Sequence, residues 1–172
     1  MLYPTISEYV SAIQDSKNNL DKLNYSVPVI DNYGKYCYCN GVSSVVFKMK
    51  DERTGKFHAL KCFTEEQKGR DKAYRFIADE GNRMIAEDFE YEDSQYVTPV
   101  EYLESELLVA SKGEIAKYPV LLMDWIDGET MNVYIANNYQ NKYAMSLLCY
   151  NFCKLATWLC SPTFAHGDIM LM

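Results

Sequence analysis

The chain has 172 residues, a formal net charge of −7 and 48% hydrophobic residues, which is enough apolar content for the core of an ordinary domain. The acidic balance argues against a nucleic-acid partner, because neutralising phosphates takes clustered Lys and Arg. No apolar run reaches the length of a membrane span, and the N-terminus lacks the basic and apolar regions of a secretion signal. We therefore expect a cytoplasmic protein with neither nucleic acid nor membrane as a partner.

The cysteines show no spacing typical of a metal site or a disulfide framework. In a reducing cytoplasm we expect them to be buried free thiols. They are Cys37, Cys39, Cys62, Cys149, Cys153 and Cys160.

The N-terminal region predicts an amphipathic helix that lies on the main body. Apolar side chains recur near helical spacing between Thr5 and Leu23. Thr5, with Glu8 three residues later, has the pattern of a capping box. A strand-rich region is expected from Val27 to about Phe63.

Within that region, two apolar runs around a polar turn predict an antiparallel hairpin. The runs are 41–50 and 57–61, and the turn is 51–56. Lys61 ends the second run, which is otherwise apolar. Since a half-buried ammonium is costly unless an anion meets it, we expect a partner for Lys61, and phosphate is one candidate.

The next region is expected to be a helix, followed by strands. The helix is predicted from Glu65 to about Glu90, with Gly81 and Asn82 as an interruption. A turn is expected at 112–114. The predicted strands are 96–100, 102–110 and 118–123.

After Gly128 the pattern becomes helical again. The segment 143–160 contains one charged residue, Lys154. A helix that is apolar on nearly all sides is typical of the interior of a larger body. Left uncovered, such a helix favours self-association, so we expect a homodimer through 143–160.

Four motifs occur in the order and at the intervals found in protein kinases. Ala59-Leu60-Lys61 resembles the Ala-x-Lys of the third strand, and Val46 lies where that family closes its glycine-rich loop. The segment 120–131 resembles the hinge with its small-residue turn. His166-Gly167-Asp168 resembles the catalytic-loop His-Arg-Asp, in the His-Gly-Asp variant. The chain is thus similar to a bacterial-type protein kinase over roughly 27–168.

The resemblance implies an α+β fold in three parts. Residues 1–26 would form the N-terminal amphipathic helix, and 27–123 a kinase-like, β-rich lobe with one long helix. Residues 124–172 would form the hinge and the first helices of a truncated helical lobe. The parent activity would be ATP-dependent phosphoryl transfer to a Ser/Thr-type hydroxyl, with a protein as the expected substrate.

The resemblance also assigns Lys61 to the nucleotide phosphates and pairs it with a helix carboxylate. The candidates are Glu80, Glu87 and Asp79, with Glu80 slightly favoured by its spacing from Lys61. The alternatives from the residues alone are a snorkelling lysine and solvated carboxylates on a helix face.

The phosphate-covering loop departs from the family. Its three glycine positions correspond to Cys39, Gly41 and Ser44, of which only Gly41 keeps the residue that lets backbone N–H groups approach phosphate closely. We therefore expect ATP binding to be weak or absent.

The remaining nucleotide contacts follow from the resemblance to the hinge. The carbonyl of Asp124 and the amide of Ile126 would hold the adenine, and Glu129 would contact the ribose. An ordinary strand running into a turn is the alternative. The other residues implied to line the site are Val46, Ala59 and Met123.

Asp168 is the implied catalytic carboxylate, placed to orient or accept the proton of the attacking hydroxyl. The family then has a Lys two residues on, where this chain has Met170, and an Asn five residues on, for which there is no position before Met172. Mg²⁺ is expected for the full-length fold, but the chain carries neither of its ligands. Because metal-borne charge neutralisation supplies much of the rate, we expect this fragment to be inactive.

Two other functions remain open. One is a non-catalytic pseudokinase module that binds a nucleotide or a partner without turnover. The other is a small-molecule kinase of the aminoglycoside/choline type, in which His-Gly-Asp is also frequent.

Overall fold

The computed structural model describes residues 3–87 and 98–160, apart from the side chains of 84–87. The chain divides into two compact units, Met1–Ile126 and Asp127–Met172, which are described separately below. The fold is of mixed α+β class, as predicted.

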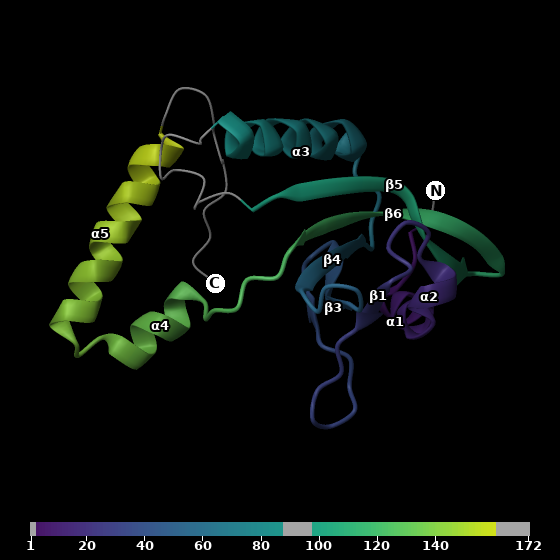
Figure 1. Ribbon diagram of the computed structural model, residues 1–172, viewed down its shortest axis with the longest axis horizontal. Coiled ribbons are helices and arrows are strands. Elements are labelled where there is room, and N and C mark those ends of the chain that lie inside the picture. Colours follow the sequence, from purple (N-terminus) through teal and green to yellow (C-terminus); the bar gives the residue numbers. More distant parts are fainter. Residues whose placement is uncertain (1–2, 88–97, 161–172) are drawn as a thin grey trace. The chain divides into compact units, whose positions relative to one another are not determined.

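The first unit is built on a six-stranded antiparallel sheet (Figure 1). The strands follow the order β1-β3-β4-β6-β5, and β2 pairs with β3. They are β1 Ser26–Pro28, β2 Tyr38–Asn40, β3 Ser44–Asp51, β4 Phe57–Phe63, β5 Val100–Ser111 and β6 Glu114–Asp124.

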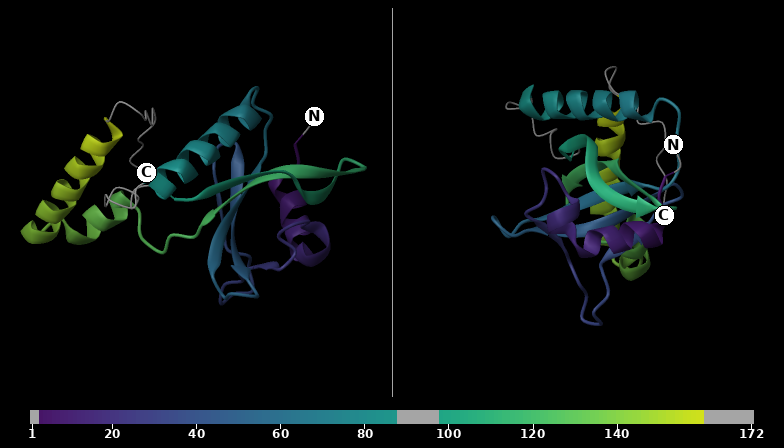
Figure 2. Two further views of the ribbon diagram at one scale, coloured as in Figure 1. Left: turned by 45° about the horizontal axis from the view of Figure 1, so that its top comes forward. Right: turned by 90° about the vertical axis from the view of Figure 1, so that its right-hand side faces the viewer.

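Among residues 3–87 and 98–126, three helices accompany this sheet. They are α1 Ile6–Gln14, α2 Ser16–Asn19 and α3 Arg70–Glu87. Helices α1 and α2 lie on one side of the sheet and α3 on the other (Figures 1 and 2).

The predicted hairpin is confirmed as β3 and β4, with Val46 opposite Lys61. Its turn is held by the carboxylate of Asp51, which accepts hydrogen bonds from the amides of Arg53 and Thr54 at 2.7 and 3.3 Å. Gly55 supplies a left-handed residue with φ of 74°, a conformation that glycine adopts without steric cost.

The turn predicted at 112–114 is also confirmed. Lys112 and Gly113 have φ angles of 50° and 86°, as a two-residue hairpin connection between right-twisted strands requires. The adjoining strand prediction needs correction, because β5 starts at Val100 and runs without a break through 102. Residues 96 and 97 lie outside the described residues.

Helix α1 begins with the predicted capping box, in which the hydroxyl of Thr5 accepts from the amide of Glu8 and the carboxylate of Glu8 accepts from the amide of Thr5. The helix ends at Gln14 rather than near Leu23. The short helix α2 follows, and Leu20 then forms a β-bridge with Leu107 of β5. Leu20 and Leu23, the last apolar residues of the predicted helix, are buried in the core.

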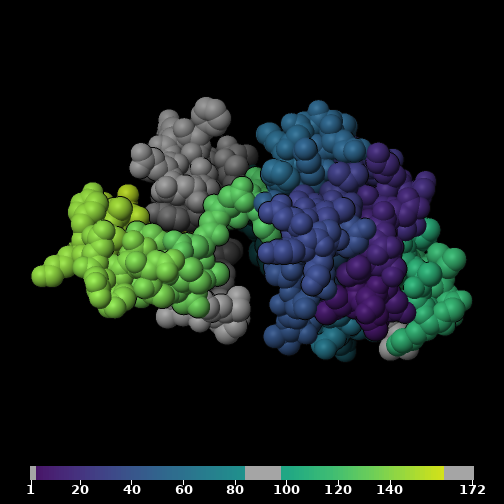
Figure 3. All heavy atoms as spheres, turned by 90° about the horizontal axis from the view of Figure 1, so that it is seen from below, coloured from purple at the N-terminus to yellow at the C-terminus, as the bar shows by residue number. Residues whose placement is uncertain are grey.

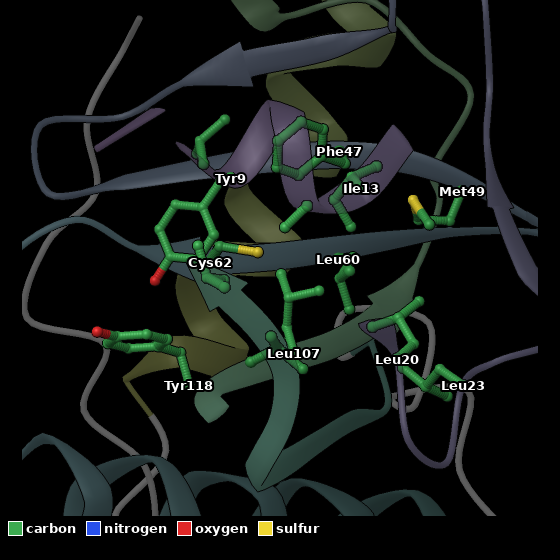
Figure 4. Close-up of a cluster of buried hydrophobic side chains, with 14 of the residues drawn as sticks. Tyr9, Ile13, Leu20, Leu23, Phe47, Met49, Leu60, Cys62, Leu107 and Tyr118 are labelled. Carbon is green, nitrogen blue, oxygen red and sulfur yellow. The ribbon is translucent and has the colours of Figure 1, made fainter. Parts of the chain in front are cut away.

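The core of the unit lies between α1 and the sheet (Figure 4). Tyr9 and Ile13 of α1 are fully buried against Phe47, Leu60 and other strand residues. The hydroxyl of Tyr9 donates a 2.7 Å hydrogen bond to the carbonyl of Phe63, which satisfies the one polar atom of this side chain. Figure 3 shows the N-terminal segment lying between the strands and the β5–β6 hairpin.

A buried carboxylate fastens the segment after α2 to β5. Glu106 is 2% exposed and lies in the register shift between Leu103 and Leu107. It accepts hydrogen bonds from the amides of Leu23 and Lys22 at 2.8 and 3.1 Å. A β-bulge re-aims a side chain, and here the carboxylate takes up two backbone donors that would otherwise be unsatisfied.

Helix α3 is continuous from Arg70 to Glu87, so the interruption predicted at Gly81 and Asn82 is wrong. A glycine inside a helix costs about 1 kcal/mol relative to alanine but does not by itself end it. The side chain of Asn82 donates to the carbonyl of Val100, which ties this part of α3 to β5.

The second unit contains α4 Met131–Asn138 and α5 Lys142–Leu159. Asn141 caps α5 by accepting from the amides of Tyr143 and Ala144. Among the described residues of this helix only Ala144 is buried. Large apolar side chains that stay exposed include Tyr143, Leu147, Tyr150 and Phe152.

The cysteines are free thiols, as expected. Their predicted burial holds for Cys62 alone, since Cys37 is half-buried and the other four are exposed. In the parts of the chain that the structure describes, no helix is both long and apolar enough to cross a bilayer.

Candidate functional site

Strand alternation divides the sheet into two faces. Phe47 of β3 and Leu60 of β4 point into the core beneath α1, so their neighbours Val46 and Lys61 point to the opposite face. The register aligns Val46, Lys61 and Leu121 in one row, and Lys48, Ala59 and Met123 in the next. We call these six residues the lysine face. It brings together four of the predicted nucleotide contacts, Val46, Ala59, Lys61 and Met123.

Lys61 lies near the centre of this face and is half-buried. Its ammonium lies 5.8 Å from the ring centroid of Tyr74 of α3. That ring stacks on Tyr102 at 6.4 Å and packs against Phe63 at 5.3 Å. Within the described residues no carboxylate forms an ion pair with Lys61, so its cation is met only by an aromatic ring.

The predicted carboxylate partner is engaged elsewhere. Glu80 pairs with Arg83 at 2.6 Å, one turn along the same helix. Asp79 is exposed and makes no ion pair among the described residues, and the side chain of Glu87 is outside them. The Lys61–Glu80 pair is therefore not formed in this structure, because a local (i, i+3) contact takes the carboxylate.

The loop between β2 and β3 is a tight turn. The amide of Gly41 donates a 2.8 Å hydrogen bond to the carbonyl of Ser44. A Cβ at position 41 would lie 2.9 Å from the Ser44 hydroxyl, so a larger residue here would displace that side chain. Ser44 is buried, and Cys39, at the first of the family's glycine positions, pairs with Val46. The loop is tied down by a hydrogen bond from the amide of Thr64 to the carbonyl of Ser43.

The predicted hinge continues from β6. The amide of Trp125 donates to the carbonyl of Phe57 at 3.4 Å. Because hydrogen bonding alternates along an antiparallel pair, the peptide groups of Asp124 face away from β4. Asp124 and Ile126 are both exposed residues.

An aromatic arrangement at the hinge was missed from the sequence. The ammonium of Lys48 lies 4.6 Å from the ring centroid of Phe57 and 4.7 Å from that of Trp125. Such contacts are each worth about 0.5–1 kcal/mol at exposed sites. The signal was present in the alternation of the hairpin, which places Lys48 and Phe57 on the same face as Lys61.

Two predicted residues cannot be placed at this site. Glu129 belongs to the second unit, where its carboxylate accepts from the side chain of Asn137 at 3.2 Å. Asp168, the predicted catalytic carboxylate, lies outside the described residues, as does His166.

A hollow of about 430 Å³ lies at the end of the sheet next to the hinge and was not predicted. Its lining includes Tyr25, Asp51, His58, Glu101 and Asp124. Burial lowers the pKa of His58, and the carboxylates of Asp51 and Asp124 oppose that shift. His58 is thereby held as the neutral imidazole at neutral pH. Among residues 3–87 and 98–160, no three His, Cys, Asp or Glu side chains come together as potential metal ligands.

The comparisons with known proteins assign no family. No protein-family model matches the chain, and no curated protein matches it in sequence.

Proposed function

We propose that the unit Met1–Ile126 is the nucleotide-binding lobe of a protein kinase-like phosphotransferase fold and that it binds ATP weakly on the lysine face. The observation that carries this proposal is the register of β3, β4 and β6. It aligns Val46, Ala59, Lys61 and Met123 on one face, and these are four of the residues to which the resemblance gives nucleotide contacts.

The charge of Lys61 supports a phosphate contact. Its ammonium has an aromatic ring and no carboxylate beside it among the described residues. A hydrogen bond between an ammonium and phosphate is about twice as strong as one between neutral groups. Phosphate would therefore supply the anion that this half-buried cation lacks.

The rest of the face suits an aromatic base. Val46 and Ala59 offer a flat apolar surface, and Met123 borders it on β6. Beyond them, the peptide groups of the exposed residues Asp124 and Ile126 offer the donor and acceptor that a base edge requires. Of the three glycine positions of the family's loop, only position 41 holds a glycine in this chain. The two missing glycines are the reason for expecting weak affinity for ATP.

The parent activity of such a fold is Mg²⁺-dependent phosphoryl transfer from ATP to a Ser/Thr-type hydroxyl of a protein. A non-catalytic nucleotide-binding module is the second candidate, and one observation favours it. Glu80 is paired with Arg83 instead of Lys61, whereas phosphoryl transfer in kinases requires the lysine–glutamate pair.

Thermal unfolding with increasing Mg²⁺–ATP tests nucleotide binding. At an ATP concentration near the dissociation constant we expect a rise in Tm of about 1–2 °C. Lys61→Met should fold normally and lose this rise. Lys50→Met, which removes an exposed lysine of the neighbouring strand β3, should keep it. Equal ATP responses in wild type and Lys61→Met, or no response in wild type at millimolar ATP, would refute the proposal.

A second variant distinguishes the catalytic lobe from the non-catalytic module. Arg83→Ala releases Glu80, so in a catalytic lobe the ATP response should increase as Glu80 becomes free to pair with Lys61. The matched control is Arg75→Ala, which changes another arginine of α3 and breaks its pair with Glu104 of β5. An unchanged ATP response in Arg83→Ala favours the non-catalytic module.

A further inference from the structure

The arginines of the chain differ in whether a carboxylate lies beside the guanidinium. Three of the four lie against a carboxylate: Arg53 against Asp51 at 3.2 Å, Arg75 against Glu104 at 2.5 Å, and Arg83 against Glu80 at 2.6 Å. Each of these three is exposed. The fourth, Arg70, is 5% exposed. The arginine that is removed most completely from water is thus the one without a carboxylate.

The guanidinium of Arg70 makes no hydrogen bond of good geometry, and the side chain of Tyr3 is a polar neighbour close enough to interact with it. Its Nε, Nη1 and Nη2 atoms are all buried and have no partner. Removing an ion from water costs several kcal/mol unless a counterion and hydrogen bonds replace the lost hydration. Native structures rarely leave buried donors unmet, and a bound ion is one of the standard explanations.

Two aromatic rings lie close to the guanidinium of Arg70. Its Cζ atom lies 4.3 Å from the ring centroid of Phe63 and 5.4 Å from that of Tyr3. Ring contacts engage the π face of a guanidinium, whereas its five N–H donors lie in its plane. Aromatic packing therefore positions the plane of donors, and no carboxylate among the described residues occupies it.

Arg53 shows the same arrangement with its anion in place. Its guanidinium lies 3.1 Å from the ring centroid of Tyr25. Its Nε and Nη2 donate to the two oxygens of the Asp51 carboxylate at 3.3 and 3.2 Å. An oxyanion at the edge of Arg70 would complete the corresponding set of contacts.

The position of Arg70 adds to this attraction. It is the first residue of α3, an 18-residue helix, and follows Gly69, whose φ is 82°. The N-terminus of a helix carries about half a positive charge and unsatisfied N–H donors. These groups bind phosphate and similar anions in many proteins.

The neighbouring charged groups do not neutralise Arg70. Asp71 accepts from the hydroxyl of Tyr102 at 2.8 Å, and Glu66, on the preceding linker, makes no hydrogen bond to Arg70. Burial raises the pKa of Tyr3, and the charge of Arg70 opposes that shift, so Tyr3 is a neutral phenol beside the cation. The flanking lysines Lys68 and Lys72 are exposed.

Tyr3 packs beside Arg70 and also reaches the surface. It lines an open hollow of about 660 Å³ together with Thr64, Glu66, Gly41 and Lys112. A rotation of the Tyr3 ring would open a route from this hollow to the guanidinium. The anion would have to be small, because the site lies between two rings.

We propose that Arg70 and the first turn of α3 bind a small oxyanion of the phosphate type, held in the plane of the guanidinium between Phe63 and Tyr3. This site is distinct from the lysine face and does not depend on nucleotide binding. The anion supplies the charge that Asp51 supplies to Arg53, and it stabilises the attachment of α3 to the end of β4.

Thermal unfolding of the full chain in phosphate or sulfate, compared with chloride at equal ionic strength, tests the proposal. We expect phosphate at about ten times its dissociation constant to raise Tm by roughly 3–6 °C, with no comparable rise in chloride. Arg70→Met should lose this response. It should be no less stable than wild type in chloride, because an apolar residue replaces a buried unpaired charge.

Arg53→Met is the matched control, since it removes a stacked arginine whose anion is already present. It should keep the full phosphate response. Lys61→Met should also keep it while losing the ATP response, so that failure at one site is distinguishable from failure at the other. If Arg70→Met does not fold, Arg70→Lys replaces it, and a response equal to that of wild type in Arg70→Lys overturns the role of the guanidinium fork.

Direct binding is measured by the ³¹P line width of inorganic phosphate. Broadening by wild type that disappears in Arg70→Met supports the site. Equal broadening by the two proteins, or equal stabilisation of wild type by phosphate and chloride, overturns it.

Discussion

The two faces of the six-stranded sheet contrast in composition although the same strands build them. Beneath α1, β3 contributes Val45, Phe47 and Met49, each with 0% exposure. On the opposite face the alternate residues of that strand are Val46 and Lys48, both half-buried. One face is closed by a helix and specifies the fold, whereas the other keeps ammonium groups among apolar residues. A strand that alternates in this way can hold a stable core and a binding surface at the same time.

The largest difference between the faces should appear on truncation of neighbouring residues. Phe47→Ala removes a fully buried ring from the α1 face and should lower the free energy of unfolding by about 3–5 kcal/mol. Val46→Ala, on the lysine face, should cost less than about 1.5 kcal/mol, because its site is open and half-hydrated. Urea unfolding followed by circular dichroism measures both, and similar losses would contradict the contrast.

Glu106 is an exception to this contrast, because it is a charged residue that is buried in the first unit. Glu106→Ala leaves the amides of Lys22 and Leu23 without their acceptor and should cost about 1–3 kcal/mol. Glu104→Ala, which removes an exposed carboxylate two residues away, should change stability by no more than about 0.5 kcal/mol. If the two substitutions have the same effect, the buried carboxylate does not fasten this segment.

A third apolar surface, on α5, extends the comparison to the second unit. Tyr143, Leu147 and Tyr150 recur at helical spacing and are 79%, 45% and 59% exposed. We propose that the chain forms a homodimer through this helix. Leu147→Glu should weaken the dimer at least about tenfold, equivalent to about 1.4 kcal/mol, whereas Ser146→Glu should not. Sedimentation velocity measures the dimer. A wild-type protein that stays monomeric at about 100 μM would exclude it.

The smallest effect should come from the exposed turn between β3 and β4. The side chain of Arg53 and the amides of Arg53 and Thr54 lower the pKa of Asp51 to about 2. Because this value is below the ordinary 3.8, the ionised carboxylate contributes stability above that pH and loses it as the pH falls toward 2. The difference in urea midpoint between wild type and Asp51→Asn should therefore shrink on acidification. A constant difference between about pH 6 and pH 2.5 would contradict the lowered pKa.

Local patterns in the sequence predicted the elements that local forces determine. The β3–β4 hairpin, the capping box at Thr5 and the turn at Lys112 all depend on residues close in sequence, and all are confirmed. The position of Lys61 on a face with Val46 and Ala59 follows from strand alternation alone.

What was missed depends on contacts between distant segments or on competition between neighbours. Beyond Gln14 the chain leads to a β-bridge between Leu20 and Leu107, a distant contact that no local pattern reveals. Glu80 was expected to pair across space with Lys61, although Arg83 at (i, i+3) was visible in the sequence and is the closer partner. Arg70 is buried beside Phe63 and Tyr3, and Tyr3 is distant from it in the sequence. A charged residue is normally expected at the surface, so the sequence did not predict this burial.

The pairing of β4 with β6 has a consequence for the order of folding. The β3–β4 and β5–β6 hairpins each join neighbouring parts of the chain, but Cys62 lies opposite Val120. Closing that contact requires the whole of α3 and its connections to be looped out, at an entropic cost that rises with loop length. We therefore expect the two hairpins to form early and the β4–β6 seam to form in the rate-limiting step. Substitutions at Leu121 should then slow folding, whereas substitutions in α3 that leave this seam intact should mainly speed unfolding.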